Sequence, residues 1–69
     1  MPITMYKPGD TVTIRKITGK DDVRQRLADM GFVCGAQVTV VNAIAGNMIL
    51  QVKQSRIALG NSMALRIII

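Results

Sequence analysis

Turn signals recur at intervals of about ten residues along this chain, and they limit each regular element to a few residues. Proline or glycine marks the signals near residues 7–10, 18–19, 31, 45–47 and 60–62, and Gln54-Ser55 is a further turn candidate. The segments between them are rich in Val, Ile, Leu and Met. Short strands at this spacing are typical of a small β-barrel or a sandwich, so the sequence predicts an all-β fold.

Five short strands are expected from this pattern, and they fall at residues 11–15, 36–41, 48–53, 56–59 and 66–69. In the third of these, Met48, Leu50 and Val52 lie on one side, because successive side chains point to opposite faces of a sheet. The alternation of the first strand fails after Lys16, where we expect it to end or bulge. A single helical turn is expected at residues 62–65. Closure into a barrel would remove exposed strand edges from such an aliphatic chain.

One short α-helix is expected at residues 21–31. Val23, Leu27 and Met30 share one face, at spacings of i, i+4 and i+7. A helix of this length is marginal in isolation, so its apolar face must pack on the rest of the fold.

Both ends of this helix carry recognisable signals. Asp21 or Asp22 is expected to cap the first turn, where a negative charge also meets the positive end of the helix dipole. Gly31 suits the left-handed position that follows many helices, and Phe32 would then fold apolar surface back onto the core.

The residue types of most catalytic and metal sites are missing from the chain. Its 69 residues, which we expect to form one domain over residues 1–69, contain no histidine and no glutamate, and aspartate supplies all 4 carboxylates. The commonest general base and metal ligand is therefore absent, and no phosphate-binding glycine loop is present. The sequence predicts no enzyme activity, no metal site, no cofactor and no small-molecule substrate.

A single cysteine, Cys34, excludes an internal disulfide bond. Its neighbours Val33 and Gly35 are uncharged, so we interpret it as a small apolar residue between the helix and the next strand, not as a nucleophile or a soft metal ligand. A lone thiol suits a reducing compartment. No segment reaches the ~18 consecutive apolar residues of a membrane span, and the start lacks a signal-peptide pattern. The expected location is cytoplasmic.

The formal net charge of +5 favours an acidic partner, such as a protein patch, a nucleic acid or an anionic membrane surface. Four cations lie close together in the sequence, namely Arg15, Lys16, Lys20 and Arg24. We predict that these four residues form a partner-binding surface at the end of the first strand and on the exposed side of the helix.

Some charges on the helix are expected to pair locally. Arg26 lies four residues after Asp22 and three before Asp29, and Arg24 lies three after Asp21. Pairs at these spacings stabilise a helix by about 0.2–0.5 kcal/mol each. Such pairing leaves the cations that precede the helix free for a partner.

Residues 26–35, with the sequence Arg-Leu-Ala-Asp-Met-Gly-Phe-Val-Cys-Gly, resemble the signature of the FeoA family. That signature has an Arg-Leu pair, a Leu- or Met-Gly-Phe run, and a glycine before the next strand. Pro8-Gly9-Asp10, the strand through Ile14 and Ile17-Thr18-Gly19 resemble the opening of the family's sequences. Ile57-Ala58-Leu59 and Ala64 with Ile67 and Ile69 resemble their close. The resemblance therefore covers nearly the whole chain.

The resemblance implies a small SH3-like β-barrel with one short helix. It also implies a cytosolic protein that docks by protein contact on the cytosolic domain of a membrane GTPase that imports Fe(II), at the inner face of the cell membrane. This connects the chain with transport of a transition metal ion. Fe(II) sites usually use imidazole and carboxylate ligands, so we expect that the chain acts by contact and does not carry the ion.

Three positions depart from the family pattern. Gly60 stands where the family often has Arg, Gly46-Asn47 where Asp-Pro is common, and Cys34 where Pro is common. The first departure removes a charge available for a partner contact, and the second weakens any transfer of that loop's role to this chain.

Two other functions stay open on the sequence. One is an SH3-like regulatory or nucleic-acid-binding module related to the C-terminal domains of metal-dependent repressors, although the chain lacks a DNA-reading helix and aromatic stacking platforms. The other is a homo-oligomer that seals its aliphatic edges by self-association. Steeply salt-dependent nucleic-acid binding would identify the first, and light scattering would identify the second.

Overall fold

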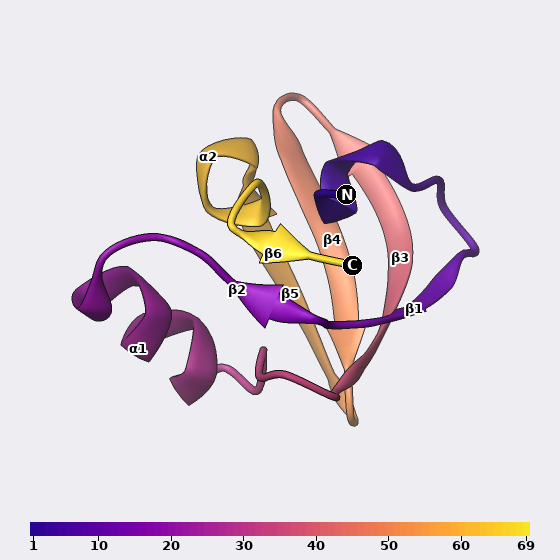
Figure 1. Ribbon diagram of the computed structural model, residues 1–69. Coiled ribbons are helices and arrows are strands. Elements are labelled where there is room, and N and C mark those ends of the chain that lie inside the picture. The colour runs from indigo at the N-terminus through magenta and orange to yellow at the C-terminus, as the bar shows by residue number, and fades with distance from the viewer.

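Two antiparallel sheets carry the fold in the computed structural model of residues 1–69 (Figure 1). Strands β1, β3, β4 and β5 form one sheet in the order β1-β3-β4-β5, and β2 pairs with β6 in the other. The prediction of an all-β fold with one short helix is confirmed. The elements are the 3-10 helix η1 (Ile3–Met5), β1 (Thr11–Thr13), β2 (Lys16–Ile17), α1 (Asp21–Asp29), β3 (Gln37–Ile44), β4 (Asn47–Val52), β5 (Ser55–Gly60), α2 (Asn61–Ala64) and β6 (Ile67–Ile68).

The inner faces of β3 and β4 supply the centre of the core. Val38 and Val40 on β3 are buried, as are Met48, Leu50 and Val52 on β4. The register places Val38 opposite Val52 and Val40 opposite Leu50, so apolar side chains meet across the two strands on the same face. The alternation read from the sequence therefore identifies this face correctly.

The first predicted strand, residues 11–15, is in fact divided between the two sheets. β1 ends at Thr13, and β2 begins at Lys16 and continues through Ile17. The Ile14 N–H donates to the Ala36 C=O, whereas the Arg15 N–H donates to the Ile68 C=O at 2.8 Å. The chain thus passes from one sheet to the other over Ile14 and Arg15, so the interruption expected near Lys16 is present and falls just before that residue.

The hairpin turns differ from the prediction by small shifts. β3 extends to Ile44, past the predicted end at residue 41, and a register shift between Val40 and Asn42 marks a bulge in it. Ala45 and Gly46 both have positive φ, at 50° and 80°, which is the geometry of the two-residue turns that match strand twist. In the next hairpin Ser55 already belongs to β5, so the turn comes one residue earlier than Gln54-Ser55.

The start of α1 differs from the predicted capping. Lys20 occupies the cap position and makes no side-chain cap bond. Asp22 Oδ1 accepts a hydrogen bond from the Val23 N–H at 2.9 Å, and Asp21 pairs with Arg24. Both carboxylates still lie in the first turn, where they complement the helix dipole.

The end of α1 follows the prediction. Gly31 has φ of 100°, and the Phe32 N–H turns back to donate to the Leu27 C=O at 2.9 Å. Leu27 and Phe32 are fully buried, while Val23 and Met30 are half-buried against the core. A Cβ at Gly31 would lie 3.6 Å from Val52 side-chain atoms, so the helix end comes close to β4.

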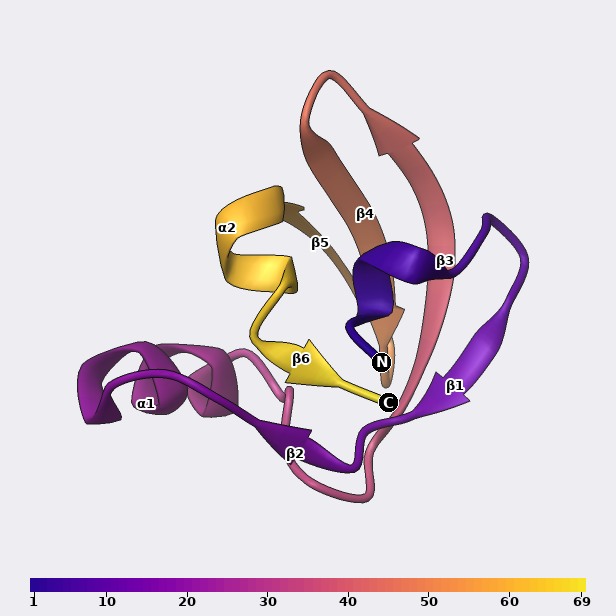
Figure 2. The ribbon, with the colours of Figure 1, turned by 45° about the horizontal axis from the view of Figure 1, so that its top comes forward.

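The N-terminal segment is part of the core, which the sequence did not indicate. Ile3, in η1, is fully buried. The two chain ends meet in both ribbon views (Figures 1 and 2). The Ile69 N–H donates to the Met1 C=O at 2.7 Å, and the Met1 ammonium donates to the Ile69 C=O at 3.0 Å. η1 and β6 are thereby held together.

Replacement of Ile3 tests this assignment. We expect Ile3→Ala to lower the free energy of unfolding by about 2–5 kcal/mol, because a fully buried side chain is lost and a cavity remains. Met5→Ala in the same 3-10 helix is the matched control. Met5 is 64% exposed, so we expect a change within about 0.5 kcal/mol. Urea unfolding measures both, and equal effects would show that η1 is not part of the core.

Candidate functional site

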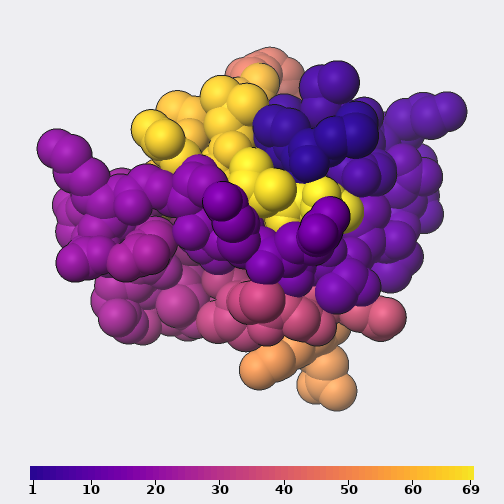
Figure 3. Space-filling view, viewed as in Figure 1, coloured from indigo at the N-terminus to yellow at the C-terminus, as the bar shows by residue number.

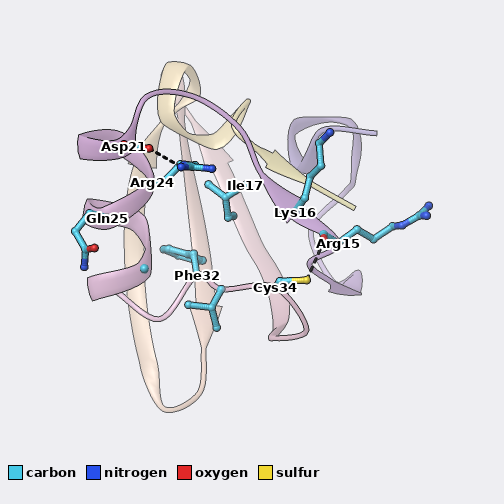
Figure 4. Close-up of a pocket in the computed structure, with 10 residues that line it drawn as sticks. Arg15, Lys16, Ile17, Asp21, Arg24, Gln25, Phe32 and Cys34 are labelled. Atoms are coloured by element: carbon cyan, nitrogen blue, oxygen red, sulfur yellow. Dashed lines mark hydrogen bonds and ion pairs between the residues drawn. The ribbon is translucent and has the colours of Figure 1, made fainter.

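An open groove lies between β2, α1 and the segment that follows α1 (Figure 4). Its volume is about 690 Å³. The groove is lined by Arg15, Lys16, Ile17, Asp21, Arg24, Gln25, Ala28, Phe32, Val33 and Cys34. In the space-filling view, this side of the molecule is formed by the purple and magenta first half of the chain (Figure 3).

The floor of the groove is apolar. Phe32 is fully buried beneath the groove, and Ile17 and Ala28 beside it are half-buried and form its apolar surface. Val33 also lines the groove and is 42% exposed. Burial of such surface by a partner is favourable by about 25 cal/mol per Å², so the groove offers an anchor for an apolar side chain.

The structure brings three of the four predicted docking residues to this groove. Arg15, Lys16 and Arg24 line it, and Lys20 lies immediately before α1. Their side chains do not converge on one point. Figure 4 shows Arg15 and Lys16 pointing away from α1, whereas Arg24 reaches from α1 toward Ile17.

The ion pairs on α1 agree only in part with the sequence. The predicted pair between Arg24 and Asp21 is present, with side-chain exposures of 52% and 93%. The predicted pairing of Arg26 is wrong. Asp29 instead accepts a hydrogen bond from Gln25 Nε2 at 2.9 Å, and Arg26 has no ion pair. Arg24 therefore forms an ion pair and Arg26 does not. The Gln25 amide bonds the Asp29 carboxylate instead, because this contact does not require a long cationic side chain to be ordered.

Cys34 also differs from its predicted role. The side chain is exposed and not packed as a small apolar residue. Its Sγ donates to the Arg15 C=O at 2.9 Å, so the thiol lies at the edge of β2 inside the groove. This position is a consequence of the turn after α1, which the sequence pattern did not resolve.

The acidic side chains do not converge into a metal site. No group of three or more His, Cys, Asp or Glu side chains lies close enough together to hold an ion. Asp10 accepts a hydrogen bond from the Lys7 N–H at 2.9 Å within its own turn, and the other carboxylates lie along α1. The groove therefore combines cations with an apolar floor and offers no assembled ligand set.

A second depression lies on the outer face of the four-stranded sheet. Thr11 and Thr39 face each other there, with their hydroxyl oxygens 3.0 Å apart. The remaining lining residues are Ala36, Gln37, Gln51 and Lys53. Such a polar outer face is ordinary for an antiparallel sheet with one buried side, so the first groove is the stronger candidate.

No helix of the structure is both long enough and apolar enough to cross a bilayer.

The family model described as the FeoA domain matches residues 1–69. A curated relative, named as an Fe(2+) transport protein A from Methanocaldococcus jannaschii, is 32% identical over 68 residues, which cover 99% of this chain and 83% of the relative. A crystal structure of an iron uptake regulatory protein, FeoA, is 33% identical with a TM-score of 0.88, over 96% of this chain and 88% of that one.

Two further solved structures place the fold. FeoA of Stenotrophomonas maltophilia, solved with zinc and described as an SH3 domain protein, is 26% identical with a TM-score of 0.83, over 99% of this chain and 87% of that one. A manganese-dependent transcriptional repressor is 20% identical with a TM-score of 0.86, over 97% of this chain and 39% of that one. The predicted SH3-like barrel is confirmed, and the repressor shares the fold alone.

The position of Cys34 predicts its reactivity. Because its side chain is exposed at the groove, we expect the thiol of the folded protein to react with Ellman's reagent without denaturant, to one thiol per chain. Absorbance of the released chromophore measures the reaction. A thiol that reacts only at urea concentrations that unfold the protein would contradict this placement.

Proposed function

The chain belongs to the FeoA domain family, and on that premise we propose that it is an accessory protein of ferrous-iron transport that docks on a membrane GTPase. In this proposal residues 1–69 act as one binding domain at the cytosolic face of the membrane. The contact is made with the cytosolic part of the transporter that imports Fe(II). The chain contributes a surface to the transport system and no chemical step.

The observation that carries this proposal is the character of the groove. Its floor is apolar, and exposed cations stand at its rim. Protein–protein interfaces combine these two features, since an apolar centre supplies affinity and peripheral charges steer association. Arg15, Lys16, Lys20 and Arg24 remain the proposed docking residues.

The set of possible metal-ligating side chains supports a role that depends on protein–protein contact and not on iron binding. The chain has no imidazole, and its aspartates are engaged within a turn or spread along α1. Fe(II) in proteins is usually held by imidazole and carboxylate groups acting together. The residues present do not fit a tight Fe(II) site, so iron is the cargo of the transporter in this proposal.

The likeness to a transcriptional repressor gives no comparable support for a regulatory role. At 20% identity it concerns the fold, and a shared fold does not carry function. The chain has one Tyr and one Phe, and Phe32 is fully buried. Stacking platforms for single-stranded nucleic acid are therefore absent.

Charge reversal at the rim tests docking. We expect Lys16→Glu combined with Lys20→Glu to weaken binding to the full-length transporter by about tenfold at low salt, because two steering charges are inverted. Lys7→Glu combined with Arg56→Glu is the matched control, since it has the same net charge but lies outside the groove. Binding is measured by biolayer interferometry on transporter held in lipid nanodiscs.

The control pair separates location from total charge. Equal weakening by both double variants would show that only net charge matters and would contradict docking at this groove. Circular dichroism is recorded for each variant, because all four positions are exposed and the fold is expected to survive. Steeply salt-dependent binding of duplex DNA by the unaltered protein would instead favour the nucleic-acid alternative.

An iron titration tests the absence of a carrier role. We expect anaerobic addition of Fe(II) to the isolated protein to give no saturating one-to-one complex at micromolar concentration, because no imidazole–carboxylate set is assembled. Isothermal titration calorimetry measures binding, and iron analysis after gel filtration checks retention. A tight stoichiometric complex would overturn the contact-only role.

A further inference from the structure

Strand β2 borders the groove along an edge that no other strand covers. It pairs with β6 alone. The consecutive residues Lys16 and Ile17 both line the groove. Successive side chains of a strand point to opposite faces, so a groove that both residues border runs along the edge of the strand. The groove therefore meets the main chain of β2 as well as its side chains.

The hydrogen bonds of β2 show which main-chain groups face this edge. The Thr18 N–H donates to the Arg66 C=O at 2.8 Å, and Ile17 stands opposite Ile67 in the register. In an antiparallel ladder, hydrogen-bonded and non-hydrogen-bonded pairs alternate. Because the next residue, Thr18, bonds to Arg66, Ile17 and Ile67 form a non-hydrogen-bonded pair, and their main-chain groups point away from each other. The Ile17 N–H and C=O thus point outward from β6, and neither takes part in the surrounding loop or side-chain hydrogen bonds.

The neighbouring acceptor on this edge has only a weak partner. The Arg15 C=O, two residues before Ile17, accepts its hydrogen bond from Cys34 Sγ. A thiol is a weak donor compared with an amide. Toward the groove, this edge therefore presents the Ile17 N–H and C=O, which face away from β6, and the Arg15 carbonyl just before β2, which is held by a group that an amide would readily replace.

The side chains around this edge indicate which kind of peptide segment could bind there. The floor is formed by the half-buried Ile17 and Ala28 above the buried Phe32, and this surface favours an apolar side chain. The charged lining groups are cationic except for Asp21, which is already paired with Arg24. A guanidinium has five N–H donors, so Arg24 retains donors for a second carboxylate. The complement is an extended segment with an apolar residue and carboxylates.

We propose that an extended acidic segment of the docking partner binds in this groove as a strand added to the free edge of β2. Its main chain pairs with the Ile17 N–H and C=O, an apolar side chain packs on Ile17 and Ala28, and a carboxylate meets Arg24. Strand addition gives affinity through main-chain bonds and specificity through side-chain pockets. The inference rests on the proposed docking function and identifies the chemistry of the partner segment.

A second copy of this chain is a poor occupant of the same edge. Two copies would each bring a formal charge of +5 and would place the same cations face to face. β2 has only two residues, so pairing with its own counterpart would form few hydrogen bonds. Charge complementarity therefore selects an acidic partner over self-association.

Amide hydrogen exchange of individual residues tests strand addition. The labelled protein is exchanged free and in complex with full-length transporter in lipid nanodiscs, then quenched, released and analysed by NMR. We expect exchange at the Ile17 N–H to slow by at least about tenfold in the complex, because the amide gains a hydrogen bond. The Thr18 N–H is the control, since it already donates to the Arg66 C=O.

The outcomes separate this inference from the proposed function. Selective slowing at Ile17 relative to Thr18 supports strand addition. If the transporter binds and the two amides change equally, the docking function stands and strand addition at β2 is overturned. If no binding to the transporter occurs at any concentration tested, the proposed function fails and the inference fails with it.

Blocking the groove provides a second and independent measurement. Cys34 is the only cysteine and lies in the groove, so N-ethylmaleimide places an uncharged adduct there. We expect complete modification to weaken transporter binding by about tenfold or more, because the adduct occupies the space of the added segment. Cys34→Ser is compared with and without the same treatment and should show no effect of the reagent. Unchanged binding after complete modification of the unaltered protein would overturn the proposal.

Discussion

The burial of Phe32 beneath the end of α1 is the contact on which the candidate site depends. A nine-residue helix is marginal alone, so α1 persists because Leu27 and Phe32 are fully buried in the same core as the strands. The left-handed Gly31 allows the chain to turn back and deliver Phe32 to that core, and its close approach to Val52 fixes the helix end near β4. The helix is thereby held to one side of the barrel (Figure 1), and the space left between it and β2 is the groove.

The parts of the fold that sequence reasoning found are those governed by local periodicity. Strand β4 alternates strictly, so Met48, Leu50 and Val52 could be assigned to the core, and the Met-Gly-Phe run identified the end of α1. Reasoning failed where distant segments decide the outcome. Nothing local shows that the chain changes sheets between β1 and β2, since the acceptors of the Ile14 and Arg15 N–H groups come from residues 36 and 68. Nothing local shows that Ile3 enters the core either, because its place is created by the meeting of the two chain ends.

The candidate site was predictable in charge but not in shape. The clustered cations in the sequence point to an acidic partner, and three of the four line one groove. The ion pairs were harder to predict, because an exposed ion pair contributes so little free energy that an amide can take the place of the cation. Asp29 illustrates this, since it bonds Gln25 in place of Arg26. The apolar floor was missed because Ile17 on β2 and Ala28 on α1 come together only in the folded chain, whereas Phe32 keeps the core position that is usual for a buried aromatic residue.

Because β2 is short, its edge can remain exposed without pairing non-specifically with strands of other molecules. A long, flat edge is a template for aggregation, and very short edge strands are one way that proteins avoid this. β2 offers two residues, which are too few to hold another strand by main-chain bonds alone. A segment that also packs on Ile17 and Ala28 and neutralises Arg24 gains from three kinds of contact at once, whereas a segment with only one of them gains little. The groove therefore discriminates between partners because each single contact is weak. The short β2 strand protects the free protein from aggregation and also makes the groove selective for a partner of matching chemistry.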